Sequence, residues 1–167
     1  MIKLPQELLL SREAHRSIVL EGMTIIESCF YEDQLEDDAY TTEHELIYLL
    51  SGELVIEVAD ESMTVRAGEA MLAKRGTYFH FCKRAKVMGQ NYESILFFIK
   101  KDFVNAFIQT YQLKAGNPSN VHSSIAKIPN SSLMDGFMQS LLPYFDQPLR
   151  GKKALLRLKT FELLIQI

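Results

Sequence analysis

The acidic residues are the most concentrated group in the sequence that could carry chemistry. Positions 32–45 hold seven carboxylates in fourteen residues. Clustered oxygens suit a hard cation such as calcium, but this run lacks the glycine and the ligand spacing of a calcium loop. We therefore expect a solvated acidic loop at these positions rather than a metal site.

The sequence motifs of common catalytic centres do not occur in this chain. There is no GxSxG, HExxH, P-loop or GxGxxG pattern. Cys29 and Cys82 lie far apart and outside any CxxC pair, which predicts two buried, apolar thiols rather than a disulfide or a zinc ligand set. The residue types thus predict neither a catalytic centre nor a cofactor.

Length, composition and charge favour one globular domain. The chain has 167 residues, of which 47% are hydrophobic, which is enough to bury a core. No apolar run approaches the roughly 20 residues that cross a bilayer, and the amino-terminal segment lacks the apolar core of a signal peptide. We expect a cytoplasmic protein without a membrane partner. A formal net charge of −3 offers no attraction for phosphate backbones, so DNA would be bound through another segment.

The middle of the chain, residues 43–82, predicts the centre of a small antiparallel barrel. Runs rich in Leu, Ile, Val and Tyr flank Gly52, and the pattern repeats around Gly68 and Gly76. Short, evenly punctuated strands without helices between them favour a jelly roll or barrel.

Further strands are expected on both sides of this centre. Residues 23–31 and 92–99 are rich in β-branched and aromatic residues, which favour strands. The first 22 residues are expected to form an arm that ends in a strand over residues 17–20. Residues 83–91 read as a polar, basic connection.

The hydrophobic period becomes helical in the last third of the chain. One helix is expected to begin at an N-cap Asp102, and a second at Ser131 or Ser132 after a polar loop. The third covers residues 152–167. These three helices are expected to form a dimerisation segment, residues 101–167, that packs on the barrel as part of one structural domain.

The last helix carries two apolar faces when it is plotted at 100° per residue. One face holds Ala154, Leu158, Phe161 and Ile165, and the other holds Leu156, Leu163 and Ile167. We expect the first face to pack on the chain's own domain and the second to form a homodimer interface. The alternative is a helix wholly buried in its own core. The absence of a capping residue at the end of this helix predicts a longer protein.

The order of these features carries a family resemblance. Glu45 precedes Gly52 with six residues between them, as in the first cupin motif, and Gly68 and Gly76 fit the second motif. Three helices then follow the strands. The sequence resembles the amino-terminal cupin-type sensor domain of AraC-type transcription regulators, bacterial proteins that carry a carboxy-terminal pair of helix-turn-helix motifs. This resemblance implies a cupin-like barrel over residues 1–100 and a DNA-binding domain beyond residue 167.

Cupin metalloenzymes resemble this barrel as well, but their ligand set is missing here. Positions that correspond to the metal-binding histidines carry other residues: Asp38, Tyr40 and Phe79. Glu45 alone cannot hold a transition metal. His44 and His80 lie close by in sequence, but successive strand side chains point to opposite faces, which turns them away from the face of Glu45. No metal and no cofactor are therefore expected.

The same alternation predicts the residues that face the barrel interior. They are Glu45, Ile47, Leu49, Phe79 and Phe81. Such a set would form an apolar cavity with one carboxylate, suited to a ligand that has few polar groups. The alternative is that these side chains fill the barrel, as they do in many small barrels.

Three functions are compatible with these features. We expect the regulatory domain of an AraC-family regulator, which senses a small-molecule effector or a regulatory partner protein and is not an enzyme. The alternatives are a stand-alone cupin enzyme, such as an isomerase, epimerase or dioxygenase, and a small-molecule-binding cupin without DNA.

Overall fold

A computed structural model describes residues 1–10, 15–30, 34–59, 61–85, 91–113, 123–146 and 151–167. The strands are β1 (Ile2–Leu4), β2 (His15–Val19), β3 (Met23–Phe30), β4 (Gln34–Thr41), β5 (His44–Ser51), β6 (Glu53–Val58), β7 (Glu61–Arg66), β8 (Ala70–Ala73), β9 (Tyr78–Arg84), β10 (Tyr92–Ile99) and β11 (Ile125–Ile128). The helices are α1 (Gln6–Leu10), α2 (Lys101–Thr110), α3 (Ser132–Phe145) and α4 (Lys153–Gln166).

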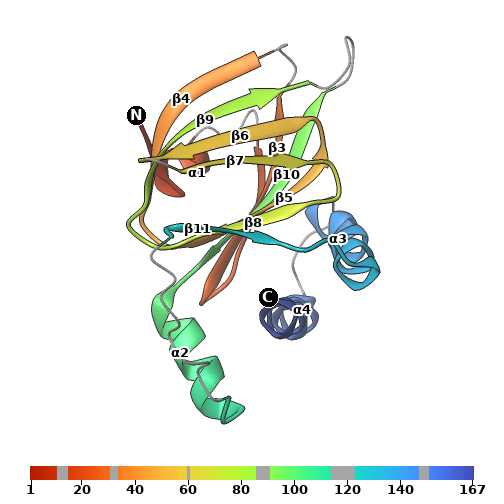
Figure 1. The fold of residues 1–167 in the computed structure, drawn as a ribbon. Coiled ribbons are helices and arrows are strands. Elements are labelled where there is room, and N and C mark those ends of the chain that lie inside the picture. Colours follow the sequence, from red (N-terminus) through yellow and green to blue (C-terminus); the bar gives the residue numbers. More distant parts are fainter. Residues whose placement is uncertain (11–14, 31–33, 60, 86–90, 114–122, 147–150) are drawn as a thin grey trace.

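Two facing sheets form a cupin-like sandwich (Figure 1). The five-stranded sheet has the order β1-β4-β9-β6-β7, and the six-stranded sheet has the order β11-β8-β5-β10-β3-β2. Neighbouring strands are antiparallel except for β1, which runs parallel to β4. The chain crosses repeatedly between the sheets from β4 to β10. This arrangement confirms the mostly β, jelly-roll fold with a helical carboxy-terminal part.

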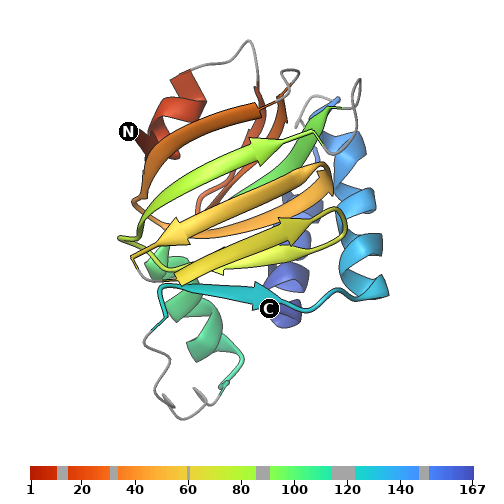
Figure 2. The same ribbon diagram turned by 45° about the horizontal axis from the view of Figure 1, so that its top comes forward.

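Apolar side chains form two cores, one on each side of the six-stranded sheet. The first core lies between the sheets, and the second lies between the six-stranded sheet and helices α3 and α4 (Figure 2). Strand β5 contributes to both, because Ile47 and Leu49 face the first core whereas Leu46 and Tyr48 face the second. The burial of apolar residues on both faces explains why β5 has an almost continuous apolar sequence.

The acidic run does not form the loop that we expected. Residues 34–41 form strand β4, which pairs with β9. Glu36 and Asp38 are exposed on the outer face, whereas Leu35, Asp37 and Ala39 alternate with them on the other face and are partly or fully buried. The high density of acidic residues hid the alternation of exposed and less exposed positions that is typical of a strand.

Helix boundaries agree with the sequence in one case and differ in another. Ser131 is the N-cap of α3, and its hydroxyl accepts a hydrogen bond of 3.1 Å from the Met134 N–H, as predicted. Asp102 is not an N-cap, because α2 begins at Lys101. Asp102 lies in the first turn instead, where its carboxylate interacts favourably with the helix dipole.

Besides β4, three elements in the described residues were not expected. Strand β11 pairs with β8 between the predicted polar loop and the second helix, and β1 and α1 lie within the amino-terminal arm. The arm also ends in a longer strand than expected, since β2 begins at His15. The sequence also predicts that the first helix ends at Gly116 and Pro118. These two positions, and positions 86–90 of the basic connection, lie outside the described residues.

Helix α4 presents the opposite face from the one we predicted. Leu156 and Leu163 have no exposed surface and pack in the second core, so they are not available to a partner, while Ile167 is 39% exposed. The side chains of Leu158 and Ile165 are 64% and 70% exposed. The assignment of Leu156 and Leu163 to a dimer interface was therefore wrong.

A polar residue within the buried stripe explains the reversal. Thr160 lies between Leu156 and Leu163 on the same face and is only 1% exposed. Its hydroxyl donates a hydrogen bond of 2.7 Å to the Arg157 carbonyl. The buried hydroxyl therefore has a hydrogen-bond partner within the same helix. A threonine in this stripe made the buried face look less apolar than the exposed one.

Within the described part of the chain, no helix has the length and apolar character needed to cross a membrane.

Candidate functional site

A cavity of about 360 Å³ lies between the two sheets. Its walls are mainly aliphatic and aromatic side chains from both sheets, including Ile47, Leu54, Ile56 and Leu96. Glu45, Lys83 and Tyr92 contribute polar groups to the same space. An apolar cavity with a few polar groups has the character of a small-molecule site.

Four of the five residues predicted to face the interior line this cavity. They are Glu45, Ile47, Phe79 and Phe81. Leu49 is fully buried between the sheets, in the first core, but is not part of the cavity wall. The predicted alternation along β5 and β9 is thus confirmed, while a ligand-binding role for these residues stays a prediction.

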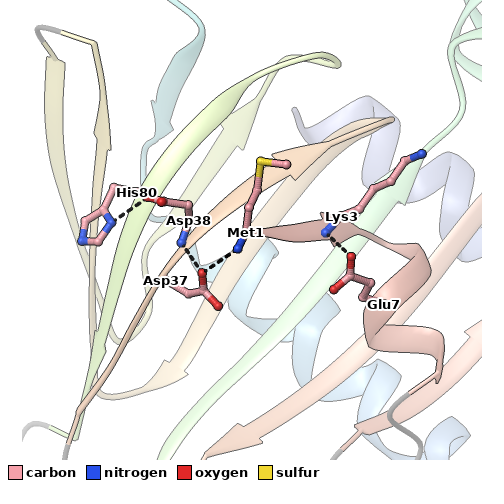
Figure 3. A network of polar contacts seen from close by, with 6 residues as sticks. All are labelled: Met1, Lys3, Glu7, Asp37, Asp38 and His80. Atoms are coloured by element: carbon pink, nitrogen blue, oxygen red, sulfur yellow. Dashed lines mark hydrogen bonds and ion pairs between the residues drawn. The ribbon is translucent and has the colours of Figure 1, made fainter.

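The two histidines next to this set face away from the cavity. His80 is exposed, and its Nδ1 lies 3.0 Å from Asp38 Oδ1 on the outer face of the five-stranded sheet (Figure 3). Asp38 and neighbouring carboxylates raise the pKa of His80 above its ordinary value. His44 is half-buried and accepts a hydrogen bond from the Arg75 N–H at 3.4 Å.

No three His, Cys, Asp or Glu side chains come together in a metal-binding group within the described residues. His15 and Cys29 line the same cavity as Glu45 but do not form such a group with it in the described part of the chain.

The amino-terminal arm covers one side of the cavity. Ile2 and Leu4 of β1, together with Leu8 of α1, belong to its wall. The sequence contained a signal for this contact, because residues 8–10 are the one apolar cluster in the arm. A parallel pairing between β1 and β4 joins residues far apart in the chain, so local patterns could not predict it.

Polar contacts hold this arm against strand β4 (Figure 3). The amino group of Met1 lies 3.2 Å from the Asp37 carboxylate. The Lys3 N–H donates to the Glu7 carboxylate at 3.0 Å, which joins β1 to α1. These groups are largely solvated, so the apolar contacts of the arm contribute more of its stability than its charges do.

Glu45 is the most unusual group in the cavity. It is 1% exposed, and neither carboxylate oxygen has a hydrogen-bond partner among the described residues. The nearby Thr41 hydroxyl donates instead to the Glu43 carbonyl at 2.9 Å. Burial raises the pKa of Glu45 to about 8, although the positive charge of Lys83 opposes that shift.

Lys83 is one of the polar cavity residues that we did not predict. Its Nζ lies 5.2 Å from the ring centroids of both Phe81 and Tyr92. The side chain as a whole is half-buried, but its ammonium end lies inside, and burial lowers the pKa of Lys83 to about 8 against the effect of Glu45. The alternation that placed Phe79 and Phe81 inside extends to Lys83, so the signal was present.

Two further groups add polar character at the edges of the site. The buried Tyr92 hydroxyl and His15 Nδ1 have no hydrogen-bond partner among the described residues. Burial and the charge of Lys83 lower the pKa of His15, which favours its neutral form. Cys29 also lines the cavity and is half-buried, whereas Cys82 is buried elsewhere, and both thiols are free.

Comparison with known protein families identifies the family of this chain. Residues 44–167, most of the chain, match the family model described as the ExsA N-terminal regulatory domain. The chain belongs to the ExsA N-terminal regulatory domain family and is thus a regulatory domain. No curated protein matches the chain by sequence.

Solved structures share the fold at low sequence identity. ToxT from Vibrio cholerae, in a ligand-free variant form, superposes with a TM-score of 0.62 and 13% identity over 85% of this chain and 53% of ToxT. Wild-type ToxT with a bound unsaturated fatty acid gives 0.60 and 14%, over 85% of this chain and 52% of ToxT. The AraC-like transcriptional activator CuxR gives 0.60 and 11%, over 90% of this chain and 53% of CuxR. The chain spans about half the length of these regulators.

Proposed function

We propose that this chain is the effector-sensing and dimerising part of a bacterial, cytoplasmic transcription regulator, and not an enzyme. Its DNA-reading helix-turn-helix domain would lie beyond residue 167. The family match and the half-length alignment with ToxT and CuxR support this assignment. Residues 1–100 would form the sensor, and residues 101–167 would form the helical output segment packed on it.

The observation that carries the sensing role is the cavity with its unpaired buried carboxyl group. A buried polar group without a partner costs free energy. Such a cost is typical of a binding site rather than of a core that serves only stability. The bound fatty acid in the ToxT structure supports a small apolar molecule, rather than a partner protein, as the kind of effector.

An isomerase or epimerase is the second candidate, because Glu45 and Lys83 are an acid and a base with shifted pKa values in one cavity. The regulatory family of the chain favours sensing over catalysis.

The exposed face of α4 is the candidate homodimer interface. Leu155, Leu158 and Ile165 are 52%, 64% and 70% exposed and lie on one side of the helix. A two-fold axis beside α4 would pair this apolar surface with itself. The proposal thus keeps the predicted homodimer and replaces the residues that form it.

A repressor fusion tests the proposed function. The chain is joined to a DNA-binding domain that represses its operator only as a dimer. We expect repression by the fusion, loss of most repression with Leu158→Asp, and no loss with Leu10→Asp, which adds a charge at an 83% exposed leucine in α1. Light scattering should give a dimer mass for the parent chain and a monomer mass for Leu158→Asp.

Two outcomes would contradict the proposal. A parent fusion that does not repress would argue against dimerisation. Equal repression by the Leu158→Asp and Leu10→Asp fusions would reject this face of α4 as the interface.

A further inference from the structure

Lys83 places an amine inside the apolar cavity. Its Nζ lies 5.2 Å from the ring centroids of Phe81 and Tyr92, and among the described residues it forms no ion pair with a carboxylate. Contact with the ring faces stabilises an ammonium group only in part. The position of this amine among aliphatic and aromatic side chains therefore favours its uncharged form.

The uncharged form is the reactive form of a lysine side chain. A neutral amine has a free electron pair that attacks a carbonyl carbon, whereas an ammonium group has none. Burial lowers the pKa of Lys83 from 10.5 to about 8, so about half of the amine is uncharged at pH 8. In an exposed lysine, less than about 1% is uncharged at that pH. Lys83 is thus a far better nucleophile at pH 8 than a lysine in water.

Glu45 supplies a proton donor in the same cavity. Its side chain is 1% exposed, and neither carboxyl oxygen has a hydrogen-bond partner among the described residues. Burial raises the pKa of Glu45 to about 8, so at neutral pH the carboxyl group keeps a proton that it can donate. The charge of each group acts on the pKa of the other, so Glu45 and Lys83 lie near each other.

An amine beside a proton donor is suited to condensation with an aldehyde. The Lys83 nitrogen adds to the aldehyde carbon, and one of its protons moves to the aldehyde oxygen, which gives a carbinolamine. Glu45 protonates the new hydroxyl group, the C–O bond breaks and water leaves. The nitrogen then returns a proton to Glu45. An amine and an aldehyde are consumed, an imine and water are formed, and no oxidant or reductant is needed.

Lys83 is the only primary amine among the described residues that line the cavity. Burial favours the neutral forms of His15 and Tyr92, which cannot form an imine. Cys29 can add to an aldehyde, but a thiol adduct cannot lose water to give a carbon–nitrogen double bond. Glu7 is exposed and accepts the Lys3 N–H. An imine in this cavity would therefore form at Lys83.

The walls and the volume of the cavity select the kind of aldehyde. Its aliphatic side chains favour a hydrocarbon chain and disfavour a polar one, which would lose its hydrogen bonds to water. At about 30 Å³ for each water-sized group, 360 Å³ holds roughly a dozen non-hydrogen atoms. Octanal, a straight-chain aldehyde, fits within this space.

We propose that the cavity binds aliphatic aldehydes covalently and reversibly, through an imine between the Lys83 nitrogen and the aldehyde carbon. The hydrocarbon chain lies against the aliphatic wall, and Glu45 transfers the protons. This proposal rests on the proposed effector-binding role of the barrel. It names a ligand class different from the fatty acid carried by ToxT.

Calorimetric titration with octanal and octan-1-ol at pH 8 tests the proposal. The two probes have the same chain length, but the alcohol cannot form an imine. For the parent chain we expect octanal to bind at least tenfold more tightly than octan-1-ol. Lys83→Arg keeps the positive charge without a nucleophilic amine and should bind the two probes equally. Lys153→Arg, at an exposed lysine on α4, should keep the preference for octanal.

Chemical trapping locates the imine on the folded parent chain. Sodium cyanoborohydride reduces an imine to a stable secondary amine, and mass spectrometry of peptides then identifies the modified lysine. With octanal at pH 8, we expect at least tenfold more modification of Lys83 than of Lys153. Glycolaldehyde, a short and polar aldehyde, should show a several-fold smaller preference for Lys83, because it gains nothing from the aliphatic wall.

Circular dichroism of each variant establishes that it is folded before binding is compared. Equal binding of octanal and octan-1-ol by the parent chain, or equal modification of Lys83 and Lys153, would overturn the imine but leave the barrel as an apolar effector site. The same preference for Lys83 with both aldehydes would overturn the selection of an aliphatic ligand. Binding of neither probe would overturn the ligand proposal, while the dimer-dependent repression assay would still test the regulatory role separately.

Discussion

Glu45 makes the stability of the folded chain depend on pH. Burial raises its pKa from 4.5 to about 8, so between these values the folded state holds a proton that the unfolded state has released. The free energy of unfolding therefore falls as the pH rises from about 4.5 to 8. Lys83 acts in the opposite direction at higher pH. Its pKa is lowered from 10.5 to about 8, so stability increases as the pH rises from 8 to 10.5.

Glu45→Gln should remove the decrease in the free energy of unfolding that Glu45 causes as the pH rises from about 4.5 to 8. We expect the variant to gain stability relative to the parent chain between pH 5 and pH 8 by on the order of 1–3 kcal/mol, since each pKa unit corresponds to about 1.4 kcal/mol. Urea denaturation at pH 5, 6.5 and 8 measures this change. Glu57→Gln, at an exposed site on β6, serves as the control and should follow the parent chain. Parallel curves for all three proteins would show that Glu45 does not titrate in this window.

Helix α4 allows a matched comparison between its two faces. Leu156→Ala removes a fully buried side chain from the second core and should destabilise the chain by about 2–5 kcal/mol. Leu158→Ala, two residues away and 64% exposed, should change the stability of the monomer by less than about 0.5 kcal/mol. Urea denaturation at low protein concentration measures both. The opposite order would mean that the helix is rotated relative to its position here.

Sequence patterns predicted strands better than helix faces in this chain. Side chains alternate strictly along β5 and β9, so fixing Glu45 and Phe79 inside placed Ile47 and Phe81 correctly. On α4 both faces are apolar, and which one is buried depends on packing in the second core with residues that are distant in the sequence. Packing with distant residues leaves no local sequence pattern. The polar Thr160 on the buried face made that face look like the exposed one.

Lys83 was missed for a different reason. It follows Phe81 by two residues and therefore shares its face, but a charged residue near a predicted turn is usually solvated. In the structure, the Lys83 ammonium group lies near the rings of Phe81 and Tyr92. Contact with two aromatic rings explains why this charged group can lie inside the cavity.

At the scale of the whole molecule, the amino-terminal arm forms part of the cavity wall. Deletion of residues 1–10 would remove Ile2, Leu4 and Leu8 from the cavity wall. We expect the shortened chain to bind the dye 1-anilinonaphthalene-8-sulfonate several-fold more strongly, because apolar surface becomes accessible. Fluorescence titration measures this change.

Single charge changes provide the controls for the arm. Asp37→Asn weakens the contact with the Met1 amino group and should give a small increase in dye binding, because a solvated ion pair contributes little. Asp38→Asn alters the outer-face contact with His80 and should give none. Dye binding by the shortened chain at the level of the full chain would show that the arm does not close the cavity.

Strand β5 is shared by the cavity and by the helical layer. Ile47 contacts the cavity, whereas the adjacent Tyr48 donates a hydrogen bond of 2.6 Å to Asp135 of α3. A displacement of β5 by a bound molecule therefore reaches α3 through one peptide unit and one hydrogen bond. If that displacement changes the affinity of two protomers for each other, thermodynamic linkage requires dimerisation to change the affinity for the bound molecule by the same factor. The concentration of the regulator would then set its own sensitivity to the effector.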